Sequence, residues 1–125
     1  MPPDGQDLPY LWDMLQAARA VQRFVTGRTY DDYLRDELLR SGVERQLEIL
    51  GEAARHLSAE FKKDHPEIPW IGIVAQRHVL AHEYGSIDHH RIWRVATARV
   101  GDLIRVLESI IPDAPDEDAD GRSLF

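Results

Sequence analysis

Hydrophobic residues recur at steps of three and four along most of the chain, the spacing of one face of an α-helix. The first run predicts a helix between Asp7, a suitable N-cap, and Gly27, a suitable stop, with Pro9 in its first turn. A shorter helix is predicted over about 30–40. Its expected apolar side consists of Tyr33, Leu34, Leu38 and Leu39.

The next run predicts a helix with an unbroken apolar stripe, and charged residues fall on its other faces. Gly51 lies inside this helix, where glycine costs about 1 kcal/mol relative to alanine. We therefore expect a neighbouring backbone to approach closely at Gly51. The stripe consists of Val43, Leu47, Leu50, Ala54, Leu57 and Phe61.

The prolines of HPEIPW interrupt the helical pattern before Trp70. A fourth helix is predicted from Trp70 to about Tyr84, where Gly85 ends it. Asp88 is predicted to cap a fifth helix, which Pro112 stops. The apolar side of this fifth helix consists of Ile92, Ala96, Val100, Leu103, Leu107 and Ile110.

These runs predict an all-α fold, an up-and-down bundle of four main helices plus one short helix. No useful length of sequence alternates with a period of two, and no internal repeat is present. The 125 residues fit one domain with its own core, which we place at 1–111. We expect the acidic remainder, 112–125, to be a disordered tail.

Composition limits the possible functions. The absence of cysteine excludes disulfides and thiolate metal ligands. The net charge of −7 argues against a general, charge-driven nucleic-acid binder, although segment 70–100 is locally basic, with four arginines against two acids. The N-terminus lacks the pattern of a signal peptide, and no apolar run is long enough to span a bilayer. We therefore expect a cytoplasmic protein without membrane contact.

The fourth predicted helix contains RHVLAHEY, residues 77–84, which places polar groups in an apolar run. Because a helix that is apolar nearly all round is buried, we expect Arg77 and His82 to lie in an interface or cleft. Two lines of side chains follow from the helical geometry. The line within about 40° of Trp70 contains Val74, Arg77, Ala81 and Tyr84. The neighbouring line contains Ile71, Ala75, His78 and His82.

Arginine and histidine together suit the cleavage of RNA without a metal. Arginine matches phosphate oxygens, and histidine moves protons near neutral pH. The step from Arg77 to His82 turns about 140° and rises about 7.5 Å, so one helix does not aim both groups at one phosphate. A second copy packed about a two-fold axis would bring such pairs together, which predicts a homodimer.

Two other interpretations of these residues remain open. In the first, Arg77 pairs with an acid such as Glu52 while His82 donates a hydrogen bond to a carbonyl. In the second, His78 and His82 are metal ligands, with Glu83, Asp88, His89 and His90 nearby. The order of residues in HVLAHE is not that of a zinc protease, and we expect no metal site. His56 and His65 are expected to be solvated surface residues.

Three blocks of the sequence resemble the HepT-like branch of the HEPN superfamily. RHVLAHEY fits its R-x4-H-x-Y motif, LEILGEAARHLS resembles its helix with a Gly-Glu-Ala core, and HPEIPWIGIVAQRHVLAHEYGSID resembles the entry, the motif helix and its exit. The similarity covers Asp7 to Ile111. It implies a helical homodimer in which the two motifs meet at a cleft.

The resemblance also implies an activity: a metal-independent endoribonuclease toxin of a type II or type VII toxin–antitoxin pair, without a cofactor. Its implied partner is an MNT-type nucleotidyltransferase antitoxin, which silences the toxin by adenylylating the motif tyrosine. By position, Arg77 and His82 are the implied catalytic pair and Tyr84 the implied adenylylation site. His78 and Glu83 are implied neighbours that support the site.

An alternative function is a non-catalytic helical subunit that binds a minimal nucleotidyltransferase. The net negative charge favours this alternative, because ribonucleases often carry a basic field. The intact Arg77, His82 and Tyr84 favour the ribonuclease. If RNA is the substrate, we expect Arg91 and Arg94 to contribute to its binding.

Overall fold

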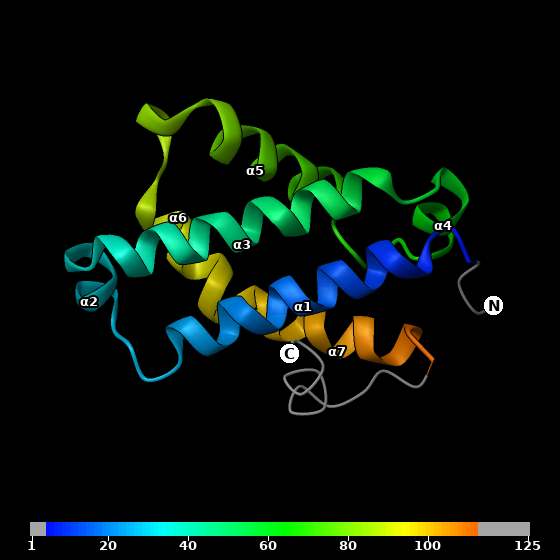
Figure 1. Cartoon of the computed structure of the whole chain (residues 1–125), viewed down its shortest axis with the longest axis horizontal. Helices are drawn as coiled ribbons and strands as arrows, with labels where there is room; N and C mark the ends of the chain where they lie inside the picture. Colours follow the sequence, from blue (N-terminus) through cyan, green and yellow to red (C-terminus); the bar gives the residue numbers. More distant parts are fainter. Residues whose placement is uncertain (1–4, 113–125) are drawn as a thin grey trace, which may run out of the picture.

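The computed structural model describes residues 5–112, and these form helices and connecting turns. The four predicted main helices are confirmed, and neighbouring long helices run in opposite directions (Figure 1). The long helices are α1 (Leu8–Val25), α3 (Glu37–His56), α5 (Trp70–His82) and α7 (Val100–Ile110). The shorter segments are α2 (Tyr30–Arg35), α4 (Ala59–Asp64), a 3-10 turn (Tyr84–Ser86), α6 (His89–Arg94) and a π-helical segment (Val95–Arg99). The predicted disordered tail lies outside the described residues, apart from Pro112.

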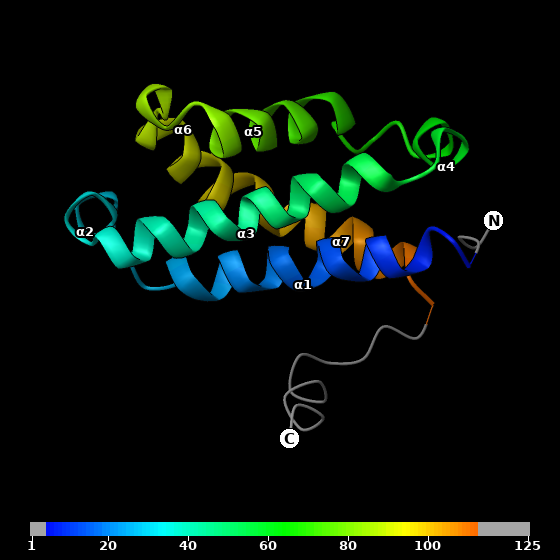
Figure 2. The same ribbon diagram turned by 45° about the horizontal axis from the view of Figure 1, so that its top comes forward.

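The core forms where the long helices pack in the spatial order α7, α1, α3 and α5. Helix α1 contacts both α3 and α7, and α3 contacts α5 on its other side. Figure 1 shows this order, and Figure 2 again shows α3 between α1 and α5. The side chains at the centre are almost fully inaccessible; they include Leu11, Met14, Val21, Val43, Leu47 and Leu107. The bundle therefore holds α5 at one edge, against α3.

The predicted helix over 30–40 is wrong, because the chain is divided at Asp36. The Asp36 carboxylate accepts a hydrogen bond from the backbone N–H of Leu39 at 3.0 Å and so caps the start of α3. Helix α3 therefore begins at Glu37, inside the predicted range. The break also changes the buried face. Tyr33 and Leu39 are buried, whereas Leu34 is 43% exposed and Leu38 is 83% exposed.

The apolar stripe of the next helix is confirmed, since all six of its residues are buried, but the helix is not continuous. Helix α3 ends at His56, and the Ser58 hydroxyl accepts a hydrogen bond from the N–H of Phe61 to begin α4. Asp7 occupies the N-cap position of α1, but its side chain does not cap α1. It accepts bonds from the Ser58 N–H at 2.8 Å and the Ser58 hydroxyl at 2.7 Å, and so ties the start of α1 to α4.

Asp88 caps the fifth predicted helix as expected, accepting bonds from the N–H groups of His90 and Arg91. That helix is interrupted, however, by the π-helical segment Val95–Arg99, which the apolar pattern did not predict. A π-helical turn contains extra residues, so it rotates the face that follows it. After this segment Val100 and Leu107 are buried as predicted, whereas Ile104 and Ile111 are buried in place of the predicted Leu103 and Ile110, which are only partly buried.

Helix α5 is a surface helix of the single chain, so the expectation that it is buried on nearly all sides is wrong here. Only Trp70 and Leu80 of this helix are buried, and Ile71 is 88% exposed. The helix also ends at His82, two residues before the predicted end, and the chain continues into the 3-10 turn. Within one chain, α5 therefore presents an apolar side to solvent.

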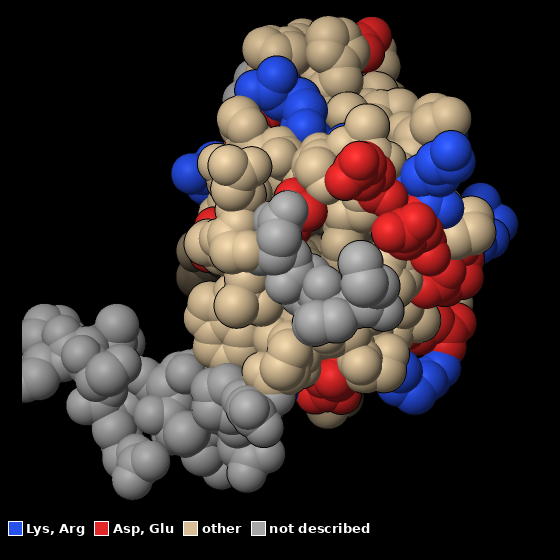
Figure 3. Space-filling model, turned by 90° about the vertical axis from the view of Figure 1, so that its right-hand side faces the viewer, with Lys and Arg blue, Asp and Glu red and all other residues tan. Residues whose placement is uncertain are grey.

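The surface carries charges of both signs. Figure 3 shows the face near α4 and the start of α1, where acidic and basic side chains are interspersed and neither sign covers the whole face. None of the described helices is both long enough and apolar enough to cross a membrane.

Candidate active site

Arg77 reaches the contact between α3 and α5 because Gly51 lies opposite it. A Cβ atom placed on Gly51 would lie 2.3 Å from the Cβ of Arg77 and 3.0 Å from the carbonyl oxygen of Ile73. Real side chains do not approach so closely, so only glycine permits this spacing of the two helices. The predicted close approach at Gly51 is confirmed, and the backbone that approaches is the one that carries Arg77.

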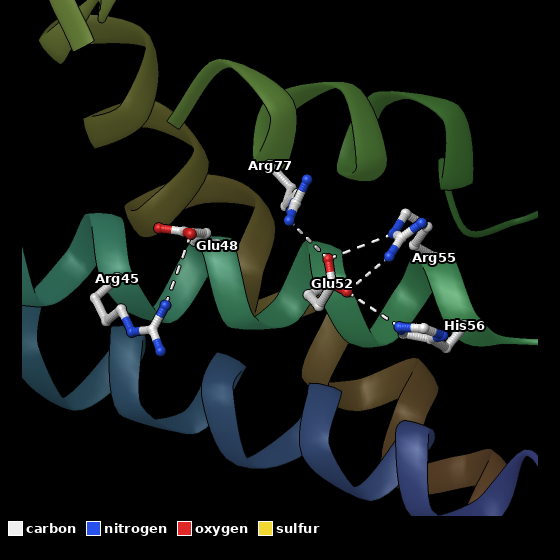
Figure 4. Close-up of polar contacts among 6 residues, drawn as sticks. All are labelled: Arg45, Glu48, Glu52, Arg55, His56 and Arg77. Atoms are coloured by element: carbon white, nitrogen blue, oxygen red, sulfur yellow. Dashed lines mark hydrogen bonds and ion pairs between the residues drawn. The ribbon is translucent and has the colours of Figure 1, made fainter. Parts of the chain in front are cut away.

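The Glu52 carboxylate connects Arg77 to two residues of α3, Arg55 and His56 (Figure 4). Its Oε2 lies 3.0 Å from Nη2 of Arg77. Its Oε1 accepts a hydrogen bond from Nη2 of Arg55 at 2.9 Å and lies 3.0 Å from Nε2 of His56. The hydrogen bond from Arg55 is the main reason that the pKa of Glu52 falls from 4.5 to about 2, and His56 and Arg77 add to the effect. Glu52 is therefore ionised at neutral pH.

The Arg77–Glu52 ion pair of the first alternative interpretation is thus present, but Arg77 keeps further hydrogen-bond donors. Arg77 and Arg55 share one carboxylate, so the three groups together keep one positive charge. The Nε of Arg77 is buried and has no hydrogen-bond partner among the described residues. Because a guanidinium has five N–H donors, Arg77 can hold Glu52 and still bind a phosphate group.

His82 is the last residue of α5 and is exposed, as is His78 one turn earlier. Their rings lie 5.0 Å apart between centroids, at 57°. Among the described residues, no carbonyl accepts a hydrogen bond from His82, so this half of the structural alternative is wrong. Within the described residues, no hydrogen bond, ion pair or ring contact joins His82 to Arg77 either. One copy of α5 does not assemble the predicted pair by itself.

The residues after His82 leave the helix. Glu83 is exposed, and its backbone N–H donates to the carbonyl of Val79 at 2.9 Å, which closes α5. Tyr84 begins the 3-10 turn that leads to α6. Arg91 and Arg94 lie exposed on α6, beyond this turn.

Two residues beside Arg77 were missed by the sequence analysis. A hollow of about 270 Å³ lies between α1, α3 and α5, and Arg77, Glu52, His56 and Tyr10 all line it. His56 is exposed, as expected of a surface residue, but its ring stacks on that of Tyr10 with centroids 5.2 Å apart and planes at 17°. Nothing in the local sequence joins these residues, because Tyr10 comes from α1 and His56 from the end of α3.

The described residues contain no cluster of metal-ligating side chains that would support the metal interpretation. Within residues 5–112, no group of three or more histidine or carboxylate side chains is arranged to hold a metal ion. His89, one of the residues considered for such a site, lies 4.0 Å from Glu44 of α3.

The described chain is an all-helical bundle with an arginine and a histidine on the helix at its edge. The comparisons assign a protein of this kind to a family of ribonucleases. A family profile described as "Ribonuclease HepT-like" matches residues 14–110. The chain belongs to this HepT-like family.

Three relatives from different organisms are similar to the chain over most of their length. A candidate RNase of Methanocaldococcus jannaschii is 33% identical over 109 residues, which cover 87% of this chain and 90% of the relative. A candidate RNase of Caldanaerobacter subterraneus is 32% identical over 103 residues, which cover 82% of this chain and 92% of the relative. A protein of Thermococcus cleftensis named probable ribonuclease HepT is 33% identical, covering 75% and 86%. No solved structure matches the chain.

Proposed function

We propose that this protein is a metal-independent endoribonuclease in which Arg77 and His82 carry out the chemistry. The observation that carries the proposal is that Arg77 lines an open hollow, on the same helix as the exposed His82, in a chain of the HepT-like family. Its guanidinium has more N–H donors than the contact with Glu52 uses. Arginine binds the phosphate and stabilises the charge that develops on it. His82 supplies the proton transfer.

The proposed reaction is a transesterification. His82 accepts the proton of the ribose 2′-hydroxyl, and the 2′-oxygen attacks phosphorus. The bond to the 5′-oxygen breaks, and this oxygen takes up a proton from water, which leaves a 2′,3′-cyclic phosphate and a 5′-hydroxyl end. The direct test is cleavage of RNA by purified protein in the presence of EDTA. Cleavage that EDTA abolishes would instead support the metal interpretation.

The complete site in this proposal contains two copies of α5. Ile71, Ala75, His78 and His82, which the helical geometry predicted to share one line, are all exposed in the single chain. An apolar residue that is 88% exposed at one end of the line suits a contact with a second chain. A two-fold axis beside this line brings the Arg77 and His82 of both copies to one cleft.

Changing Ile71 to lysine is expected to weaken the dimer by roughly a hundredfold and to reduce RNA cleavage with it. Lysine keeps a good helix propensity, but its charge would be buried without a partner in the interface. Sedimentation equilibrium measures the dimerisation constant. The matched control is Leu38→Lys, at an apolar residue that is 83% exposed at the start of α3. Equal dimerisation of the two variants would place the interface elsewhere.

The finer part of the proposal is regulation as a toxin. We propose that the protein belongs to a type II or type VII toxin–antitoxin pair and that an MNT-type nucleotidyltransferase silences it at Tyr84. The Tyr84 hydroxyl would attack the α-phosphorus of ATP and release pyrophosphate and a proton. Tyr84 begins the turn that directly follows α5, so an AMP group there would add bulk and a phosphate next to the motif helix. In this proposal the added phosphate pairs with the Arg77 guanidinium and occupies the RNA site.

Incubation with such a nucleotidyltransferase and ATP is expected to add AMP to Tyr84 and to reduce RNA cleavage by about a hundredfold or more, because the site is blocked. Peptide mass spectrometry locates the modification. Tyr84→Phe, which lacks the acceptor oxygen, should gain no mass and keep its activity in the presence of the partner. Inhibition of the Tyr84→Phe variant without added mass would show that the partner acts by binding alone.

A further inference from the structure

The hollow beside Arg77 has an aromatic wall that the proposed chemistry does not use. The stacked rings of Tyr10 and His56 border this hollow and also a second, open hollow of about 460 Å³ that continues toward Asp7 and Ser58. The two hollows thus meet at one ring pair. Together they form a groove between α1 and α3 that starts at Arg77, and we refer to it as the α1–α3 groove.

Glu52 fixes the position of this wall relative to the arginine. One carboxylate holds Nη2 of Arg77 at 3.0 Å and Nε2 of His56 at 3.0 Å, so the guanidinium and the imidazole lie on either side of it (Figure 4). A phosphate bound to the remaining donors of Arg77 would therefore have an aromatic surface within reach of its own nucleotide or the next.

The groove also presents hydrogen-bond acceptors. Asp13 of α1 and Glu48 of α3 line the same hollow as the ring pair. Glu48 has Arg45 beside it, at 3.6 Å, whereas Asp13 is exposed. A carboxylate accepts two N–H bonds side by side, and guanine offers its N1–H and amino group in that arrangement. Uracil offers one N–H between two carbonyl oxygens, which carboxylates repel.

We propose that the α1–α3 groove is a nucleobase subsite for single-stranded RNA, in which a base stacks on the Tyr10–His56 wall and gives its N–H groups to Asp13 and Glu48. The proposal rests on the proposed ribonuclease function and adds a specificity: guanine is preferred over uracil at the nucleotide that occupies the groove. Stacking on aromatic side chains is a general means of holding single-stranded nucleic acid.

The test is a binding measurement with short 2′-O-methyl oligonucleotides, which lack the attacking hydroxyl and are not cleaved. Three fluorescent probes share one backbone length: one with alternating guanine and uracil, one with uracil alone, and one without bases. Wild-type protein is expected to bind the guanine-containing probe about tenfold more tightly than the probe without bases, with the uracil probe between them.

Tyr10→Leu is expected to remove this difference by weakening each probe with bases to the affinity of the probe without bases, a loss of about tenfold for the guanine-containing probe. The probe without bases should bind unchanged. Tyr10→Phe should behave as wild type, because its ring is retained. His56→Ala, at an exposed position, gives a second variant whose effect should match Tyr10→Leu without disturbing the core. The matched control is Tyr30→Leu. The Tyr30 ring also contacts a histidine ring, that of His90, with centroids 5.2 Å apart, but Tyr30 does not line the groove.

Equal weakening of all three probes by Tyr10→Leu and His56→Ala, no weakening at all, or no binding by wild type would overturn the subsite. Because these probes are not cleaved, the result is separate from the cleavage assay. Cleavage of ordinary RNA together with unchanged base discrimination in both variants would reject the subsite alone. Base-dependent binding without any cleavage would reject the proposed ribonuclease and leave a base-binding groove.

Discussion

Arg77→Ala and His82→Ala are each expected to lower the rate of RNA cleavage by about a hundredfold to a thousandfold. Removal of Arg77 takes away the group that stabilises charge on the phosphate, and removal of His82 takes away the proton acceptor. Arg77→Lys should restore little of the cleavage rate, because the lysine ammonium lacks the planar guanidinium geometry that binds two phosphate oxygens. Initial rates on a labelled RNA, measured with EDTA present, give the comparison.

The control for these variants is His65→Ala, because His65 also pairs with a glutamate, Glu67, at 3.1 Å, but does not line the hollow beside Arg77. Its cleavage rate should stay close to that of wild type. Cleavage that survives both Arg77→Ala and His82→Ala would come from a contaminant. The non-catalytic partner of a nucleotidyltransferase would then be the better description of the protein.

Gly51→Ala is expected to reduce stability by up to about 3 kcal/mol and cleavage by at least about tenfold. The new Cβ would lie 2.3 Å from the Cβ of Arg77 and 3.0 Å from the carbonyl oxygen of Ile73. The oxygen belongs to the main chain of α5, and the Cβ of Arg77 is bonded directly to that main chain. These atoms cannot move aside alone, so α5 must shift and carry Arg77 with it. Denaturant unfolding and the cleavage assay measure the two effects.

Gly101→Ala is the matched control for this substitution. Gly101 is also helical, but an added Cβ there would lie 3.7 Å from Gln22 and 3.9 Å from Arg105, ordinary contact distances. Alanine should therefore stabilise the protein by up to about 1 kcal/mol through its helix propensity. A Gly51→Ala variant as stable and active as this control would contradict the assigned role of Gly51 in placing Arg77.

The sequence predicted the long helices well because each buries a stripe that repeats at helical spacing. The stripe from Val43 to Phe61 is buried throughout. Its break before α4 was missed, because periodicity continues across Leu57 and Ser58, whereas the helix ends through the cap at Ser58. The π-helical segment was also missed, because Ile92, Ala96 and Val100 are buried at steps of four across it, so the apolar pattern shows no interruption there.

The candidate site was predicted only in part. The motif proposes Arg77 and His82, which the structure places on one helix without joining them, and the position of Gly51 indicated the close approach beside Arg77. The Tyr10–His56 wall depends on the packing of α1 against α3, and a single sequence contains no record of that contact. The helical geometry also predicted the line of Ile71, Ala75, His78 and His82 on α5, but it did not predict that this line is exposed in the single chain.

The most direct test of the central claim is the RNA cleavage rate of a mixture of Arg77→Ala and His82→Ala proteins, unfolded and refolded together. If two chains combine their motifs in one cleft, mixed dimers retain one guanidinium and one imidazole, and the mixture cleaves clearly faster than either variant alone. A mixture no more active than its components, although mixed dimers form, would mean that no site is built from two copies of the motif helix.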